Sequence, residues 1–125
     1  MIGRLRGGDK TTIRNRTHEL IERLNIEEWS NRSGQNLSGG VRRLVGFCMA
    51  VVNPGKLVIL DEPTNDIDPL RRRLLWAIVA ELGEQGKSVL LVTHNVLESE
   101  RAVNRLAIIN EGTVGAGGVG QLYFY

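Results

Sequence analysis

The sequence lacks most of the features that mark secreted, membrane-spanning or nucleic-acid-binding proteins. A single cysteine, Cys48, rules out an internal disulfide, so the composition suits a reducing compartment. No apolar run approaches the roughly 20 residues that cross a bilayer, and the first ten residues contain no apolar segment of a secretory signal. The formal net charge of +2 is too small to predict nucleic acid or anionic lipid as a partner.

Helical and strand patterns alternate along the 125 residues, which predicts an α/β fold with a parallel sheet. The expected elements are helices at about 11–24, 39–52 and 68–83, strands within 56–63 and 88–94, a short helix within 95–103 and a strand pair within 105–118. The first helix is expected to be capped by Thr11 or Thr12. Both central strands are continuous apolar runs, which predicts burial on both faces of the sheet.

Two adjacent acids, Asp61 and Glu62, end the first apolar strand. The carboxyl ends of parallel strands face the ligand crevice, so Asp61 can hold Mg²⁺ and Glu62 can act as a general base toward water. A pair of solvated or helix-capping acids is the alternative. His94 ends the next strand and is expected on the same side, where it could contact a γ-phosphate or polarise the water.

The stretch LSGG, residues 37–40, opens a predicted helix. Gly39 and Gly40 have no side chains that would keep a phosphate from the backbone, and the helix N-terminus offers N–H groups and a positive dipole. Ser38 adds a hydroxyl donor and is the expected N-cap. A plain Ser-Gly helix cap is the alternative to an anion site.

LSGG, LVILDEP (57–63), NDID (65–68) and VTHN (92–95) follow one another in an order and spacing that resemble the ATP-binding-cassette (ABC) ATPase family. The resemblance extends over about residues 11–118 and is strongest to the ATPases of drug-export transporters. It implies a partial P-loop NTPase fold, α/β, with a parallel sheet, flanking helices and a remnant of the helical subdomain. Residues 1–36 would be a basic N-terminus with that remnant, and 37–125 the C-terminal part of the ATPase core.

The resemblance also assigns roles to individual residues, with ATP and Mg²⁺ as the implied cofactors. Asp61 would bind the metal, and Glu62 and His94 would be catalytic. The nucleotide would be contacted by the start of the signature motif, Leu37, Ser38, Gly39 and Gly40, and by the D-loop residue Asp68.

The lysine loop G-x-x-x-x-G-K-[ST] of that family is not found in this sequence. The nearest stretch, GRLRGGDKTT (3–12), has Asp9 where the lysine is required and no preceding strand. We therefore expect the chain to begin after the nucleotide-gripping half and to be inactive alone. Since two ATPase domains of this family face each other head to tail, LSGG would serve a nucleotide held by another chain.

These expectations imply particular partners and a location. The partners are a complementary or intact ABC ATPase domain and a membrane-spanning transporter subunit, with no nucleic acid. A bare sheet edge favours a homo-oligomer or swapped dimer. The expected location is cytoplasmic, with peripheral attachment to the cytoplasmic face of the membrane as a variant.

Two other functions stay open from the sequence. The chain could be a non-catalytic module that docks on an intact ABC ATPase and modulates it. A relative that acts in DNA repair or translation is a third reading, which the absence of a strongly basic surface disfavours. The run Arg71, Arg72 and Arg73 is expected to be a solvated helix face.

Overall fold

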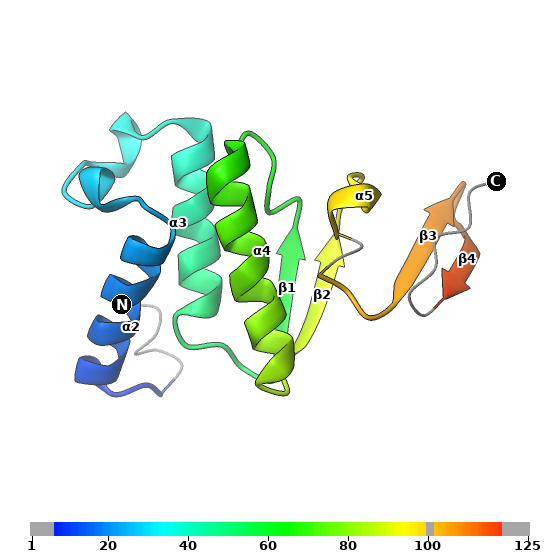
Figure 1. Cartoon of the computed structure of the whole chain (residues 1–125), viewed down its shortest axis with the longest axis horizontal. Helices are drawn as coiled ribbons and strands as arrows, with labels where there is room; N and C mark the ends of the chain where they lie inside the picture. Colours follow the sequence, from blue (N-terminus) through cyan, green and yellow to red (C-terminus); the bar gives the residue numbers. More distant parts are fainter. Residues whose placement is uncertain (1–6, 100–101, 119–125) are drawn as a thin grey trace. The chain divides into compact units, whose positions relative to one another are not determined.

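The computed structural model describes residues 7–99 and 102–118, and contacts divide the chain into two units, Met1–Thr93 and His94–Tyr125. The elements are α2 (Lys10–Arg23), the 3-10 turns η1 (Glu27–Trp29) and η2 (Gly34–Asn36), α3 (Gly39–Val51), β1 (Leu57–Asp61), α4 (Pro69–Glu84), β2 (Ser88–Val92), α5 (Val96–Ser99), β3 (Leu106–Asn110) and β4 (Thr113–Gly118) (Figure 1). Their order agrees with the predicted α/β pattern.

The first unit is built on a parallel pair of strands. β1 and β2 pair in register from Leu57 with Ser88 to Asp61 with Val92, and α4 connects them. The predicted parallel pairing is therefore confirmed. The end of β1 and the starts of α3 and α4 lie at the same end of this unit (Figure 1).

The two faces of this sheet differ in burial, which corrects the prediction of strands buried on both faces. Val58 and Leu60 are buried under the helices. The other face carries four apolar side chains that are each more than half exposed, namely Leu57, Ile59, Leu90 and Val92. Among the described residues, helices cover only the face that carries Val58 and Leu60, so the second face has no covering layer.

The core of the first unit joins three helices to the covered face of the sheet. Its fully buried large side chains come from α2, α3, α4 and the residue after α2, namely Leu20, Leu24, Leu44, Val51, Leu75, Ile78 and Leu82. Their three- and four-residue spacing puts them on one stripe of each helix. Arg23 of α2 also pairs with Glu81 of α4, which anchors the first helix to the others.

The cap of α2 differs from the prediction. The Asp9 carboxylate accepts hydrogen bonds from the N–H groups of Thr11 and Thr12, both at 3.0 Å, so Asp9 is the N-cap. Ser38 caps α3 as predicted, and Asp68, followed by Pro69, caps α4 at the start of the helix predicted at about 68–83.

The second unit contains α5 and an antiparallel hairpin. β3 and β4 are joined at Glu111 and Gly112, both of which have positive φ, as a tight hairpin turn requires. The predicted strand pair is confirmed, and α5 lies within the stretch 95–103 where a short helix was predicted. None of the helices in residues 7–99 and 102–118 combines the length and hydropathy of a bilayer-spanning segment.

The buried stripe of α4 yields a stability prediction. Leu75→Ala removes a fully buried side chain and should lower the free energy of unfolding by about 2–5 kcal/mol in urea titrations. Arg73→Ala, on the exposed side of the same helix, is the matched control and should change it by less than about 0.5 kcal/mol. Equal midpoints for the two variants would contradict this packing.

Candidate functional site

The LSGG stretch lies where α3 begins. The Ser38 hydroxyl accepts a hydrogen bond from the Val41 N–H at 3.3 Å, and Ser38 and Gly39 are exposed while Leu37 is half-buried. The first N–H groups of a helix have no acceptor within the helix, so this end suits an anion. Ser38 therefore caps α3, as predicted, whereas binding of an anion at this helix start stays a prediction.

The acidic pair lies at the end of β1. Asp61 is exposed, whereas several hydrogen bonds hold Glu62. Its N–H donates to the Val92 carbonyl at 2.9 Å, its carbonyl accepts from the Arg43 guanidinium at 2.9 Å, and its Oε2 accepts from the Thr93 hydroxyl at 3.1 Å. These contacts fix both the backbone and the carboxylate of Glu62.

Sequence reasoning did not assign a role to Arg43 or Thr93. Thr93 precedes His94 in the VTHN stretch, and Arg43 lies three residues after Gly40, on the same side of α3. The three-residue spacing from Gly40 could have indicated that Arg43 lies on the same side of the helix as Gly40. Its acceptor on Glu62 is 19 residues away in the sequence, and the sequence alone gives no means to find it.

Asp68 lies at the start of α4. Its Oδ1 accepts from the N–H groups of Leu70 at 3.1 Å and Arg71 at 3.0 Å. The Arg71 backbone N–H is the main reason why the pKa of Asp68 lies below its usual value, and the Arg71 guanidinium lowers the pKa further. Asp68 is therefore held as a charged cap beside the candidate site.

Arg71 corrects the prediction that the arginine run is a solvated face. Its guanidinium donates to the Asn25 carbonyl at 2.7 and 3.1 Å and to Asp68 at 3.0 Å, and it lies 4.6 Å from the centre of the Trp29 ring. Only 17% of its side chain is exposed. Arg71 thus ties the segment after α2 to the start of α4, because planar guanidinium groups suit such combined contacts.

His94 is exposed and begins the second unit, two residues after β2 ends. The structure therefore agrees with its predicted position after the strand. Its predicted contact with a γ-phosphate or water remains a prediction.

The side chains available near Asp61 show whether this chain could bind the implied Mg²⁺ without a nucleotide. Among residues 7–99 and 102–118 no three His, Cys, Asp or Glu side chains cluster as a metal site would require. Mg²⁺ commonly uses one or two carboxylates together with substrate phosphates and water. Asp61 thus fits a metal that arrives with a nucleotide, rather than a metal site formed by the described residues alone.

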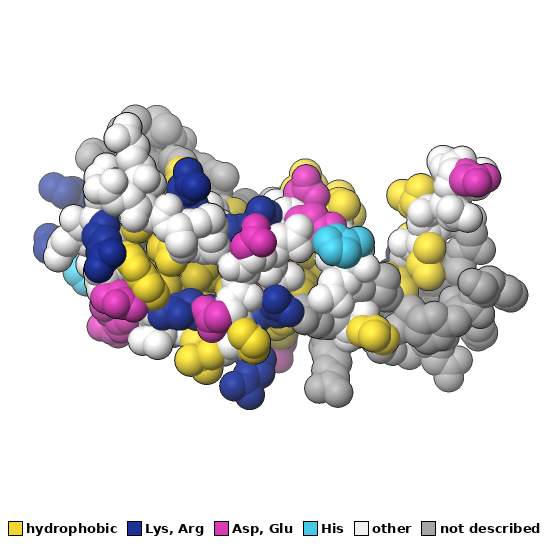
Figure 2. All heavy atoms as spheres, turned by 90° about the horizontal axis from the view of Figure 1, so that it is seen from above, with side chains coloured by type: hydrophobic (Ala, Val, Ile, Leu, Met, Phe, Trp, Pro, Cys, Tyr) yellow, Lys and Arg dark blue, Asp and Glu magenta, His cyan; other side chains and the backbone are white. Residues whose placement is uncertain are grey.

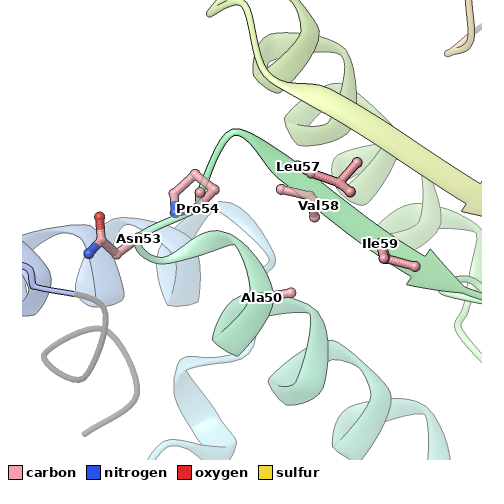
Figure 3. A pocket seen from close by; sticks show the side chains of 7 residues that line it. Ala50, Asn53, Pro54, Leu57, Val58 and Ile59 are labelled. Carbon is pink, nitrogen blue, oxygen red and sulfur yellow. The ribbon is translucent and has the colours of Figure 1, made fainter.

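A hollow of about 440 Å³ lies elsewhere, beside the start of β1. The end of α3 and the turn after it form one wall, and Leu57, Val58 and Ile59 of β1 form the other (Figure 3). It is at the opposite end of β1 from Asp61 and Glu62, so it is not part of the candidate site.

Basic and acidic side chains are interspersed over the first unit, with apolar patches between them, on the face that Figure 2 shows. Charges of one sign do not dominate that part of the described surface. This agrees with the small net charge of +2, and the expectation of no nucleic-acid partner stays a prediction.

The ABC transporter family profile matches residues 4–65. The chain is 38% identical over 112 residues to the Nod factor export ATP-binding protein I of Cupriavidus pinatubonensis, and 36% identical over 118 residues to the daunorubicin/doxorubicin resistance ATP-binding protein DrrA of Streptomyces peucetius. These matches cover 90% and 94% of the chain.

Solved structures agree with these matches. An ATP-binding subunit of an ABC transporter superposes with a TM-score of 0.82 at 26% identity over 90% of the chain. A dimeric bacterial ABC transporter cassette superposes with a TM-score of 0.78 at 24% identity, which shows the shared fold.

The fold is therefore part of the P-loop NTPase fold of ABC cassettes. The chain belongs to the ABC transporter ATP-binding family, as its motifs predicted. It spans 34% and 36% of the two curated relatives and 47% and 50% of the two solved chains. The predicted boundary between residues 36 and 37 concerns subdomains of that family and stays a prediction.

The charged cap at Asp68 yields a pH prediction. Asp68→Ala should lower the free energy of unfolding by about 1 kcal/mol at neutral pH. A lowered folded-state pKa stabilises the fold above the unfolded-state pKa of about 3.9, and this contribution is lost as pH falls through the folded-state value. The difference between wild type and Asp68→Ala should therefore shrink in urea titrations below about pH 4.

Asp68→Asn is the control for that experiment. Asparagine keeps a cap acceptor but does not titrate, so its advantage over alanine should not change with pH. A wild-type advantage that stays constant down to about pH 2 would contradict the charged-cap interpretation.

Proposed function

We propose that this chain is the C-terminal part of an ABC ATPase and contributes the signature motif and the acidic strand end to ATP hydrolysis that drives export. The observation that carries the proposal is the contact between these two elements: Arg43 of the signature helix donates to the carbonyl of Glu62 at 2.9 Å. In a member of this family, that contact joins an anion-binding helix start to a candidate general base.

Each residue would have a separate task. Ser38, Gly39 and the first N–H groups of α3 would face a phosphate of a nucleotide gripped by a lysine loop outside this chain. Asp61 would provide a carboxylate to Mg²⁺, whose charge neutralises the phosphates. Glu62 would accept a proton from the attacking water, and its bond from Thr93 would orient it.

Three further residues keep their predicted roles in the proposal. Leu37 and the D-loop residue Asp68 would contact the nucleotide, and His94 would contact the terminal phosphate. The chain would act on the cytoplasmic side, with a membrane-spanning subunit. The export direction is suggested by the name of one curated relative, the Nod factor export ATP-binding protein I.

The uncovered apolar face of the β1–β2 sheet favours the proposal that this chain binds a partner. Leu57, Ile59, Leu90 and Val92 are more than half exposed, and a sheet with open edges and an apolar face tends to pair with further structure. We propose that the missing nucleotide-gripping part of a cassette covers this face, because the solved cassettes are about twice as long as the chain. That part can belong to the same protein or to a separate chain.

The proposed function predicts the ATP turnover of this chain. Residues 1–125 alone should hydrolyse no ATP above background in a phosphate-release assay, because no lysine loop holds the phosphates. Adding the complementary part of a related cassette should restore turnover, and Glu62→Gln in this chain should remove it again. Thr17→Ala, on a helix outside the candidate site, is the matched control.

Two outcomes would reject this assignment. Turnover by residues 1–125 alone that Glu62→Gln abolishes would show that no outside lysine loop is needed. Inhibition of an intact homologous ATPase, without rescue of a complementary part, would select the alternative function as a modulating module.

The uncovered sheet face predicts that copies of the chain associate with one another. In the absence of the complementary part, the open face should make the chain self-associate at micromolar concentration in light scattering. Ile59→Lys should weaken this association, because it places a charge on the exposed apolar face. Leu70→Lys, at an exposed apolar position on α4, should not. A monomeric wild type, or equal effects of the two variants, would contradict the use of this face.

A further inference from the structure

The two glycines of LSGG have different surroundings. A Cβ added to Gly39 would meet no atom within 4 Å, whereas a Cβ added to Gly40 would lie 2.3 Å from the carbonyl oxygen of Asp66. A separation this short to a backbone atom cannot be relieved by a side-chain rotation. Gly40 therefore lets α3 lie directly against the backbone of the loop after β1, which a phosphate-binding role for both glycines does not explain.

Arg43 makes a second contact between α3 and the same loop. It lies three residues after Gly40, on the same side of the helix. One guanidinium nitrogen donates to the Glu62 carbonyl at 2.9 Å, and another lies 4.0 Å from the Asp66 carboxylate. The Arg43 Nε is buried without an acceptor among the described residues. Burial of that group opposes stability, so the fold alone gives little reason for an arginine here.

The residues that α3 contacts have an unusual backbone. Glu62 and Asp66 have φ of 43° and 60°, in the left-handed region that residues other than glycine rarely adopt. Such conformations persist only where the surroundings hold them. Gly40 and Arg43 reach these two residues.

We propose that Gly40 and Arg43 are positioning residues that couple the first turn of the signature helix to the conformation of Glu62–Asp66 within one copy of the chain. A shift of α3 at its N-terminus moves the Gly40 backbone against Asp66 and the Arg43 guanidinium against Glu62. The placement of the candidate base then depends on the placement of the signature. This inference deepens the proposed function and rests on it for its catalytic consequence.

The coupling is tested first by hydrogen exchange in residues 1–125 without nucleotide. The probes are the amides of Asn65 and Ile67, which donate within the loop. Gly40→Ala and Arg43→Met should raise their exchange by about tenfold or more through local opening. Arg43→Lys, which keeps a donor, should restore part of the protection.

Matched controls separate local from global effects. Gly39→Ala has free space for its methyl group and Arg42→Met changes an exposed neighbour, so both should leave the loop amides unchanged. The amides of Leu75 and Ile78 in the core of α4 should be unaffected in every variant. Unchanged loop exchange in Gly40→Ala and Arg43→Met, or an equal rise in the controls, would overturn the coupling.

The catalytic consequence is read in the reconstituted ATPase. Gly40→Ala and Arg43→Met should lower kcat with little change in KM, and Arg43→Lys should recover part of kcat. Gly39→Ala should raise KM, because its methyl group meets the phosphate and not the loop. Loss through KM in Arg43→Met would overturn the positioning role.

The two proposals fail separately in this design. If wild type gives no turnover after reconstitution, the proposed function fails, and the exchange data still decide whether Gly40 and Arg43 hold the loop.

Discussion

The packing of α3 and α4 against one face of the β1–β2 pair is the interaction on which the candidate site depends. α3 is joined to β1 by a short turn and packs antiparallel to it, so its N-terminus lies at the carboxyl end of β1. α4 starts just after that end and returns along the strand. Burial of Val58 and Leu60 under these helices therefore brings two capped helix starts and the acids Asp61 and Glu62 to one edge.

The same packing accounts for the uncovered face of the sheet. Both strands are apolar at nearly every position, a composition typical of strands buried on two faces. Within the described residues only one face is covered. The strand sequences are consequently suited to a larger assembly than the chain itself forms, in line with relatives of which it spans about a third and solved cassettes of which it spans about half.

Local signals predicted the parts of the fold that depend on neighbouring residues. The cap Ser38 before α3, the start of α4 near residue 68 and the strand pair within 105–118 were all predicted from short patterns. Long-range partners were not, because sequence gives no distance: Arg71 binds the Asn25 carbonyl 46 residues away, and was wrongly assigned to a solvated face. The exposure of one sheet face among the described residues was likewise not predicted, because apolar runs such as β1 and β2 are typical of strands buried on both faces.

Within the proposed function, the contacts of Glu62 indicate which steps depend on this chain and which depend on its complementary part. Val92, Thr93 and Arg43 hold this residue from within the chain, so the candidate base needs no outside part to be oriented. The phosphates, in contrast, need a lysine loop that these 125 residues do not contain. If the cassette is divided between the lysine loop and this chain, one part binds the nucleotide phosphates and the other orients the candidate base. Because proton acceptance is productive only where the phosphate is positioned, hydrolysis would require both parts even though contacts within this chain already hold Glu62.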